Sequence, residues 1–104
     1  MIIYPSFINR KKSKNMNQNI LAIFTINTDQ LPSHFQEIIQ HEQEVVAQWR
    51  EEGILEHLFL RPTRNGAVLV FKDIDENKAQ ELMATLPLFP FMKSVEYLPL
   101  LKQF

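Results

Sequence analysis

Glu42 interrupts an apolar stripe on a predicted helix over residues 32–52. Six apolar side chains of that helix fall within one sector about 120° wide at about 100° per residue, with Glu42 in its middle: Phe35, Ile38, Ile39, Val45, Val46 and Trp49. A core-facing carboxylate is costly to desolvate, and burial raises its pKa toward the range of a general base. We therefore expect Glu42 to carry a proton in catalysis. The alternative is a carboxylate that reaches solvent or an arginine at a cavity mouth.

His57 and Arg61 belong to a predicted strand over residues 54–61, where alternation places them on one side with Leu55 and Phe59. Neutral imidazole is the usual proton shuttle near pH 7, and a guanidinium can hold a carboxylate through two parallel hydrogen bonds. We expect His57 to assist the helix carboxylate and Arg61 to bind a substrate carboxylate. The alternatives are a histidine at a subunit interface and an arginine at a solvated strand end.

No pattern in the sequence is typical of a metal or phosphate site. His34 and His41 would lie two helical turns apart, about 10.5 Å along the axis, which is too far for one metal ion. Gly53 and Gly66 are isolated, so they form no phosphate-binding loop. We expect neither a metal nor a cofactor.

The composition is that of one globular domain of 104 residues, 45% hydrophobic and 22% charged. A net charge of −1 gives no electrostatic reason to bind nucleic acid or an anionic membrane. The absence of cysteine excludes disulfides and thiolate chemistry and fits a cytoplasmic protein. No apolar run approaches the roughly 20 residues that span a bilayer.

Residues 1–19 differ from the rest of the chain. The apolar stretch 1–7 precedes the basic cluster 10–14, which is the reverse of the order in a signal peptide. We expect a flexible arm, or an upstream start with Met16 as the natural initiator. The domain itself would then comprise residues 20–104.

Periodicity and turn residues predict a β-α-β-β-α-β order. This order is that of an α+β, ferredoxin-like fold. The six predicted elements cover residues 19–27, 32–52, 54–61, 67–72, 75–86 and 94–100. Pro32 suits the first turn of the first helix, Asp75 is expected to cap the second, and residues 62–66 are expected to form a hairpin turn.

Both faces of the predicted sheet are apolar. In the first strand Leu21 and Ile23 point away from their apolar neighbours, and in the third strand Val68 and Val70 do the same. Two helices can cover only one face of a four-stranded sheet, so the second face needs a partner. We expect a homodimer that pairs sheet to sheet.

Residues 86–92 read Leu-Pro-Leu-Phe-Pro-Phe-Met, without a charge and with two prolines that exclude helix and central strand. A loop this apolar is expected at a pocket wall or a subunit contact rather than in water. We expect Phe89 and Phe91, together with Trp49 of the helix, to contact a small-molecule ligand. The alternatives are a connector that packs on its own core and, for Trp49, a place in the aromatic core.

This segment, placed between a helix and a last strand, resembles the signature of the muconolactone delta-isomerase family. Three further segments, residues 42–44, 50–53 and 57–59, stand at spacings similar to those of that family. The resemblance implies a dimeric α/β barrel, assembly up to a homodecamer, and a cofactor-independent isomerisation in aromatic catabolism. In that reaction a proton is removed next to a lactone carbonyl and returned two carbons along the conjugated system. Glu42 and His57 match positions of the family.

Two other functions remain open. A binding or accessory protein of the same fold would use the pocket without catalysis. A cofactor-independent monooxygenase of the dimeric barrel class would use it for an electron-rich aromatic substrate. Fold alone does not choose among the three.

Overall fold

The computed structural model describes residues 18–104, and most of the expected N-terminal arm lies outside these described residues. The predicted element order and the α+β, ferredoxin-like fold are confirmed. The elements are β1 (Gln18–Ile26), α1 (Phe35–Glu51), β2 (Leu55–Leu60), β3 (Gly66–Lys72), α2 (Glu76–Ala84) and β4 (Met92–Leu101), with short 3₁₀ turns at Thr28–Gln30 and Phe89–Phe91.

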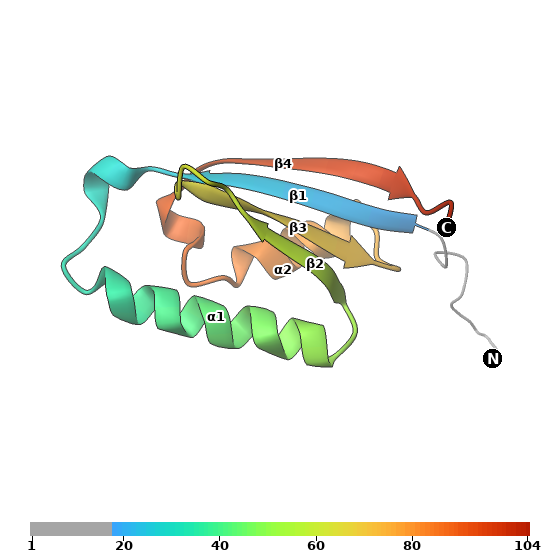
Figure 1. Ribbon diagram of the computed structural model, residues 1–104, viewed down its shortest axis with the longest axis horizontal. Coiled ribbons are helices and arrows are strands. Elements are labelled where there is room, and N and C mark those ends of the chain that lie inside the picture. Colours follow the sequence, from blue (N-terminus) through green and yellow to red (C-terminus); the bar gives the residue numbers. More distant parts are fainter. Residues whose placement is uncertain (1–17) are drawn as a thin grey trace.

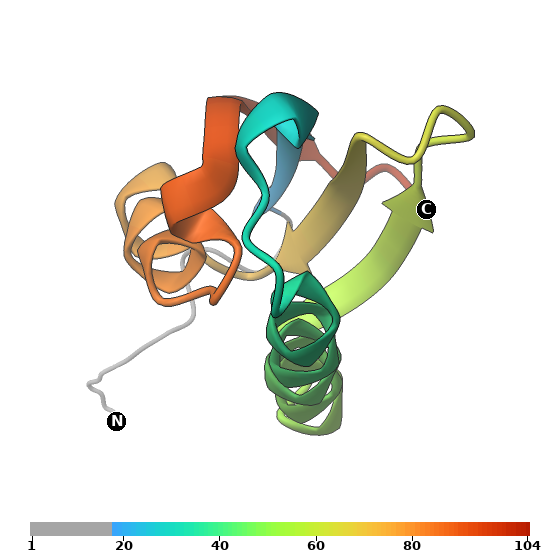
Figure 2. The same ribbon diagram turned by 90° about the vertical axis from the view of Figure 1, so that its left-hand side faces the viewer.

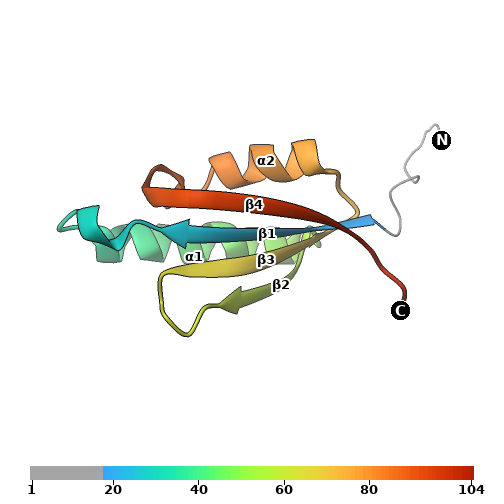
Figure 3. The ribbon, with the colours of Figure 1, turned by 90° about the horizontal axis from the view of Figure 1, so that it is seen from above.

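The four strands form one antiparallel sheet in the order β2-β3-β1-β4. Both helices lie on the same face of this sheet (Figures 1 and 2). Seen from the opposite side, the strands carry no helix above them (Figure 3). We call these two sides the helix face, which carries Ile20 and Phe24, and the open face, which carries Leu21 and Ile23.

Local hydrogen bonds set the helix ends. The carbonyl of Pro32 accepts the Phe35 N–H at 3.2 Å, so Pro32 precedes α1 instead of lying in its first turn as predicted. Asp75 caps α2 as expected, its carboxylate accepting the Lys78 N–H at 2.8 Å. At the other end the Thr85 hydroxyl donates to the Leu82 carbonyl, which ends α2 before residue 86.

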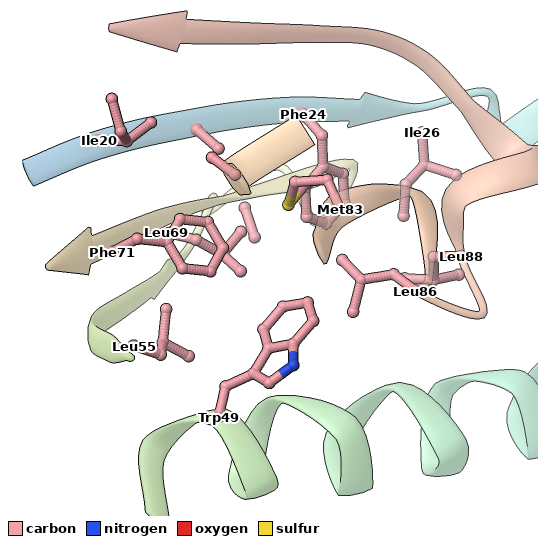
Figure 4. Close-up of a cluster of buried hydrophobic side chains, with 13 residues drawn as sticks. Ile20, Phe24, Ile26, Trp49, Leu55, Leu69, Phe71, Met83, Leu86 and Leu88 are labelled. Carbon is pink, nitrogen blue, oxygen red and sulfur yellow. The ribbon is translucent and has the colours of Figure 1, made fainter. Parts of the chain in front are cut away.

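The core lies between the helix face and the two helices (Figure 4). Trp49 extends from α1 toward the sheet, with 6% of its surface exposed, and its ring meets Phe71 edge-on at 5.6 Å between centroids. Met83 of α2 is fully buried on the same side of the sheet. Trp49 is therefore a core residue that ties α1 to β3.

A β-bulge in β2 changes the predicted strand pattern. Leu55 pairs with Phe71 and His57 pairs with Val70, so Glu56 is an extra residue in the ladder. Leu55 therefore points to the helix face and His57 to the open face, and the prediction that both share one side is wrong. His57 stacks on Phe59 at 5.9 Å between ring centroids.

The open face is mainly apolar in the middle, although the exposed Glu96 of β4 pairs with Ile23 there, and it is polar at one end. Its middle carries Leu21, Ile23, Val68, Val70 and Leu98, which the strand registers place on one side of the sheet. At the end, Glu56 accepts a hydrogen bond from Asn19 at 3.2 Å and pairs with Lys102 at 3.1 Å. The Lys102 ammonium holds the pKa of Glu56 below its ordinary value.

The two glycines should respond very differently to alanine. A Cβ at Gly66 would overlap the backbone oxygen of Phe24 in the neighbouring strand, whereas a Cβ at Gly53 meets no atom within 4 Å. Gly53 has φ +78°, so G53A should lose about 1–2 kcal/mol from the left-handed conformation alone. We expect G66A to lose about 3 kcal/mol or more, because β1 must shift. Urea unfolding measures both, and equal losses would contradict the close approach of β3 to β1.

Candidate functional site

A cavity of about 660 Å³ lies between the N-terminal half of α1 and the end of the sheet where β2 and β3 connect. Its walls are mainly apolar and come from both sheet and helix: Phe24, Ile26, Ile39, Val46, Leu58, Leu60, Pro62, Gly66, Ala67, Leu69 and Leu88. Its polar lining comes from α1 and from the β2–β3 connection: Gln36, Glu42, Gln43, Arg61 and Arg64. The cavity is large enough for a small organic molecule.

Glu42 contributes the one carboxyl group among the described residues that line this cavity. Its side chain comes from the apolar stripe of α1, as predicted, and the residue is only 9% exposed. One carboxylate oxygen, Oε1, accepts a hydrogen bond of 3.1 Å from the backbone N–H of Leu88, 46 residues away. This hydrogen bond joins α1 to the segment 86–92.

Desolvation by this burial raises the pKa of Glu42 from an ordinary value of 4.5 to about 7, and the Leu88 hydrogen bond acts in the opposite direction. A group with this pKa is about half ionised near neutral pH. It can both accept and donate a proton there, which is the property that general acid–base catalysis requires.

The fold of residues 86–92 explains why the Leu88 N–H is available. The neighbouring N–H groups are used within the segment, since Phe89 donates to Leu86 and Phe91 donates to Leu88, each at 2.9 Å. Leu86 and Leu88 are buried, with 2% and 3% of their surfaces exposed. The two buried leucines therefore anchor the segment, and the backbone N–H of Leu88 donates to Glu42.

The two phenylalanines of this segment lie elsewhere. Phe89 is 39% exposed in the single chain, and Phe91 packs partly buried against the core. Neither is among the residues that line the cavity, although Leu88 is. Within the segment 86–92, it is therefore Leu88 that forms the expected pocket wall.

Arg61 lines the cavity but directs its guanidinium elsewhere. Its Nη1 donates to the hydroxyl of Thr25 at 3.1 Å, and Thr25 alternates with the helix-face residue Phe24 and so belongs to the open face. The Arg61 stem passes over Gly66, where an added Cβ would lie 3.2 Å from Cδ. The cation therefore braces the end of the sheet.

His57 lies apart from Glu42 within one chain. It borders a second, smaller groove of about 430 Å³ between α1 and β2, together with Arg50 and Glu56. Its ring stacks on Phe59 at the open face. The structure thus brings Glu42, Leu88 and the Arg61 stem to one cavity and leaves His57 and Trp49 outside it.

Two groups at this cavity were not predicted from the sequence. A backbone donor such as the Leu88 N–H has no side-chain signal, and Arg64 lies in a hairpin read only as a turn. Arg64 has φ +61° and lines the cavity beside Pro62. A non-glycine residue in this conformation is uncommon, but φ cannot be read from the sequence.

Over residues 20–102 the sequence matches the family model described as muconolactone delta-isomerase. The chain belongs to the muconolactone delta-isomerase family. The matched residues include Glu42, the segment 86–92 and both helices. A comparison with curated proteins gave no match.

Two further features of this family member concern metals and membranes. Across residues 18–104, no group of three histidine, cysteine, aspartate or glutamate side chains is placed to hold a metal ion. Neither α1 nor α2, the helices of the described part of the chain, is long and apolar enough to cross a membrane.

The stability of the protein should depend on pH through Glu42. Between about pH 4.5 and 7 the unfolded chain loses this proton while the folded chain keeps it, so stability falls as pH rises. One pKa unit corresponds to about 1.4 kcal/mol, so the loss is on the order of 3 kcal/mol. We expect E42Q, relative to wild type, to gain this amount between pH 4.5 and 8 in urea unfolding.

Glu44 provides the matched control, because it lies exposed on the same helix. E44Q should follow the wild-type pH dependence. A stability difference between E42Q and wild type that stays constant with pH would contradict the raised pKa.

Proposed function

We propose that this protein catalyses a cofactor-independent proton shift in a small unsaturated lactone, with Glu42 as the proton carrier. The observation that supports this most is a nearly buried carboxyl with a pKa of about 7 at the wall of an apolar cavity. Membership of the muconolactone delta-isomerase family supports the choice of a lactone.

The reaction needs one group that first accepts a proton as a base and then returns the same proton as an acid. Ionised Glu42 takes a proton from a carbon that conjugation with the lactone carbonyl acidifies, and the carbon–carbon double bond moves by one position. Neutral Glu42 then returns the proton two carbons away, so no proton is gained or lost overall. The raised pKa makes ionised Glu42 a stronger base than an ordinary carboxylate, and the proton that it takes from the substrate is the one that neutral Glu42 then returns.

The Leu88 N–H has a positioning role in this scheme. It occupies Oε1 of Glu42 and leaves Oε2 for the transferred proton. The apolar walls limit the water that would exchange with that proton. A single carboxyl can serve both carbons because they belong to one small conjugated system, so the scheme requires no second proton carrier and assigns none to His57.

We also propose that two chains pair through their open faces as a dimeric barrel. The face offers Leu98, which is 48% exposed, and Phe59, which is 57% exposed, beside the half-buried side chains of β1 and β3. Burying these groups would remove apolar surface from water at about 25 cal/mol per Å². A homodecamer, as the family resemblance implies, would repeat such a dimer.

Muconolactone is the substrate with which to test the reaction. We expect the double-bond shift to be followed directly by ultraviolet absorbance, with kcat/KM rising with pH and levelling above a midpoint of about 7, where Glu42 becomes ionised. E42Q should lower turnover by about 10²–10⁴-fold, whereas E44Q should retain it. Binding without turnover would favour the accessory protein, and turnover that requires oxygen would favour the monooxygenase.

The pairing has its own test. L98K places a charge on the open face at a side chain exposed in the single chain, so the fold should survive while the dimer dissociates. L101K is the control, because Leu101 is also exposed, at 72%, but pairs with Gln18, which the strand alternation places on the helix side of the sheet. Light scattering should give the monomer mass for L98K alone. An unchanged mass for both variants would refute pairing through this face.

A further inference from the structure

The cavity carries its two cations at one place, the connection between β2 and β3. Arg61 and Arg64 both line the cavity, and Glu42 lines it from α1. The guanidinium of Arg61 is already engaged, since it donates to Thr25 on the open face. The second cation, Arg64, is the one whose charge is available to the cavity.

The backbone at Arg64 supports this interpretation. Its N–H donates to the Arg61 carbonyl at 2.8 Å, which closes the turn, and its φ of +61° lies in the left-handed region. Glycine or asparagine adopts this conformation more readily than arginine does. Within residues 18–104 the Arg64 side chain makes no hydrogen bond or ion pair, so the arginine does not serve the turn itself.

The charges of Glu42 and Arg64 would orient a ligand in the cavity. An anionic group beside ionised Glu42 would be repelled strongly, because both charges would lie in a poorly solvated space. The same anionic group beside Arg64 would gain a charge-assisted, two-point hydrogen bond. A molecule with an apolar, unsaturated body and one carboxylate therefore fits with its body toward Glu42 and its carboxylate toward Arg64.

We propose that Arg64, rather than Arg61, binds the carboxylate of the ligand and so selects small unsaturated carboxylic acids over their neutral analogues. This inference rests on the proposed function and names the group that orients its substrate. Arg64 is thus a specificity-determining residue supplied by the hairpin turn.

The test uses a ligand pair that needs no turnover: phenylacetate and phenylacetamide, which differ in charge but hardly in shape. Binding to the full chain is measured by ligand-observed NMR, for wild type, R64G and R64K. We expect wild type to prefer the acid by about tenfold or more, R64G to lose this preference, and R64K to keep part of it. R64G should fold at least as stably as wild type, since glycine relaxes the turn.

Two further variants separate a specific site from general charge. R50A removes a cation from the second groove outside this cavity and should keep the acid preference. R61M should also keep it. If wild type shows no acid preference, if R64G keeps it, or if R61M alone abolishes it, the proposal is overturned. Failure of muconolactone turnover, in contrast, would overturn only the proposed reaction, because the binding comparison does not depend on it.

Discussion

The site depends on one buried hydrogen bond, from the Leu88 N–H to Oε1 of Glu42. Burial alone would favour the neutral carboxyl strongly, and this donor partly offsets that effect, so that the pKa comes to about 7 rather than higher. The same bond holds the segment 86–92 against α1. An uncharged loop with two prolines thus supports a titratable group, and its Leu86 and Leu88 side chains are buried while Phe89 stays exposed in the single chain.

The two faces of the sheet have different roles: the helix face forms the cavity, and the open face carries the uncovered apolar surface. On the helix face, Phe24 of β1 with Ala67 and Leu69 of β3 forms part of the cavity wall beside α1. On the open face, the apolar middle has no covering element among the described residues. Arg61 links the two faces, because its stem borders the cavity while its guanidinium reaches Thr25. The cavity and the apolar open face are therefore adjacent but are formed by different side chains.

Features that depend on periodicity were predicted well from the sequence. The element order, the cap at Asp75 and the position of Glu42 on the apolar stripe depend on local spacing, and each is found in the structure. Prediction failed where one residue changes the register. The bulge at Glu56 turns Leu55 to the other face from His57, and no residue type in that strand signals it.

Tertiary partners were also beyond prediction. The Leu88 N–H and the Thr25 hydroxyl have no distinctive sequence pattern, yet they decide how Glu42 and Arg61 are used. Phe89 was expected at the ligand, but the 3₁₀ turn over Phe89–Phe91 leaves its side chain exposed in the single chain. Such outcomes depend on how distant segments meet rather than on local preference.

The central claim is that Glu42 holds its proton up to neutral pH inside the folded chain. The most direct measurement is a ¹³C NMR titration of the Glu42 side-chain carboxyl carbon in the wild-type protein from pH 3 to 9. A midpoint at about 7 is the predicted result. A midpoint near the ordinary value of 4.5 would contradict the claim, because burial would then have added nothing to the basicity of the carboxylate, which would be a weak base toward a carbon acid.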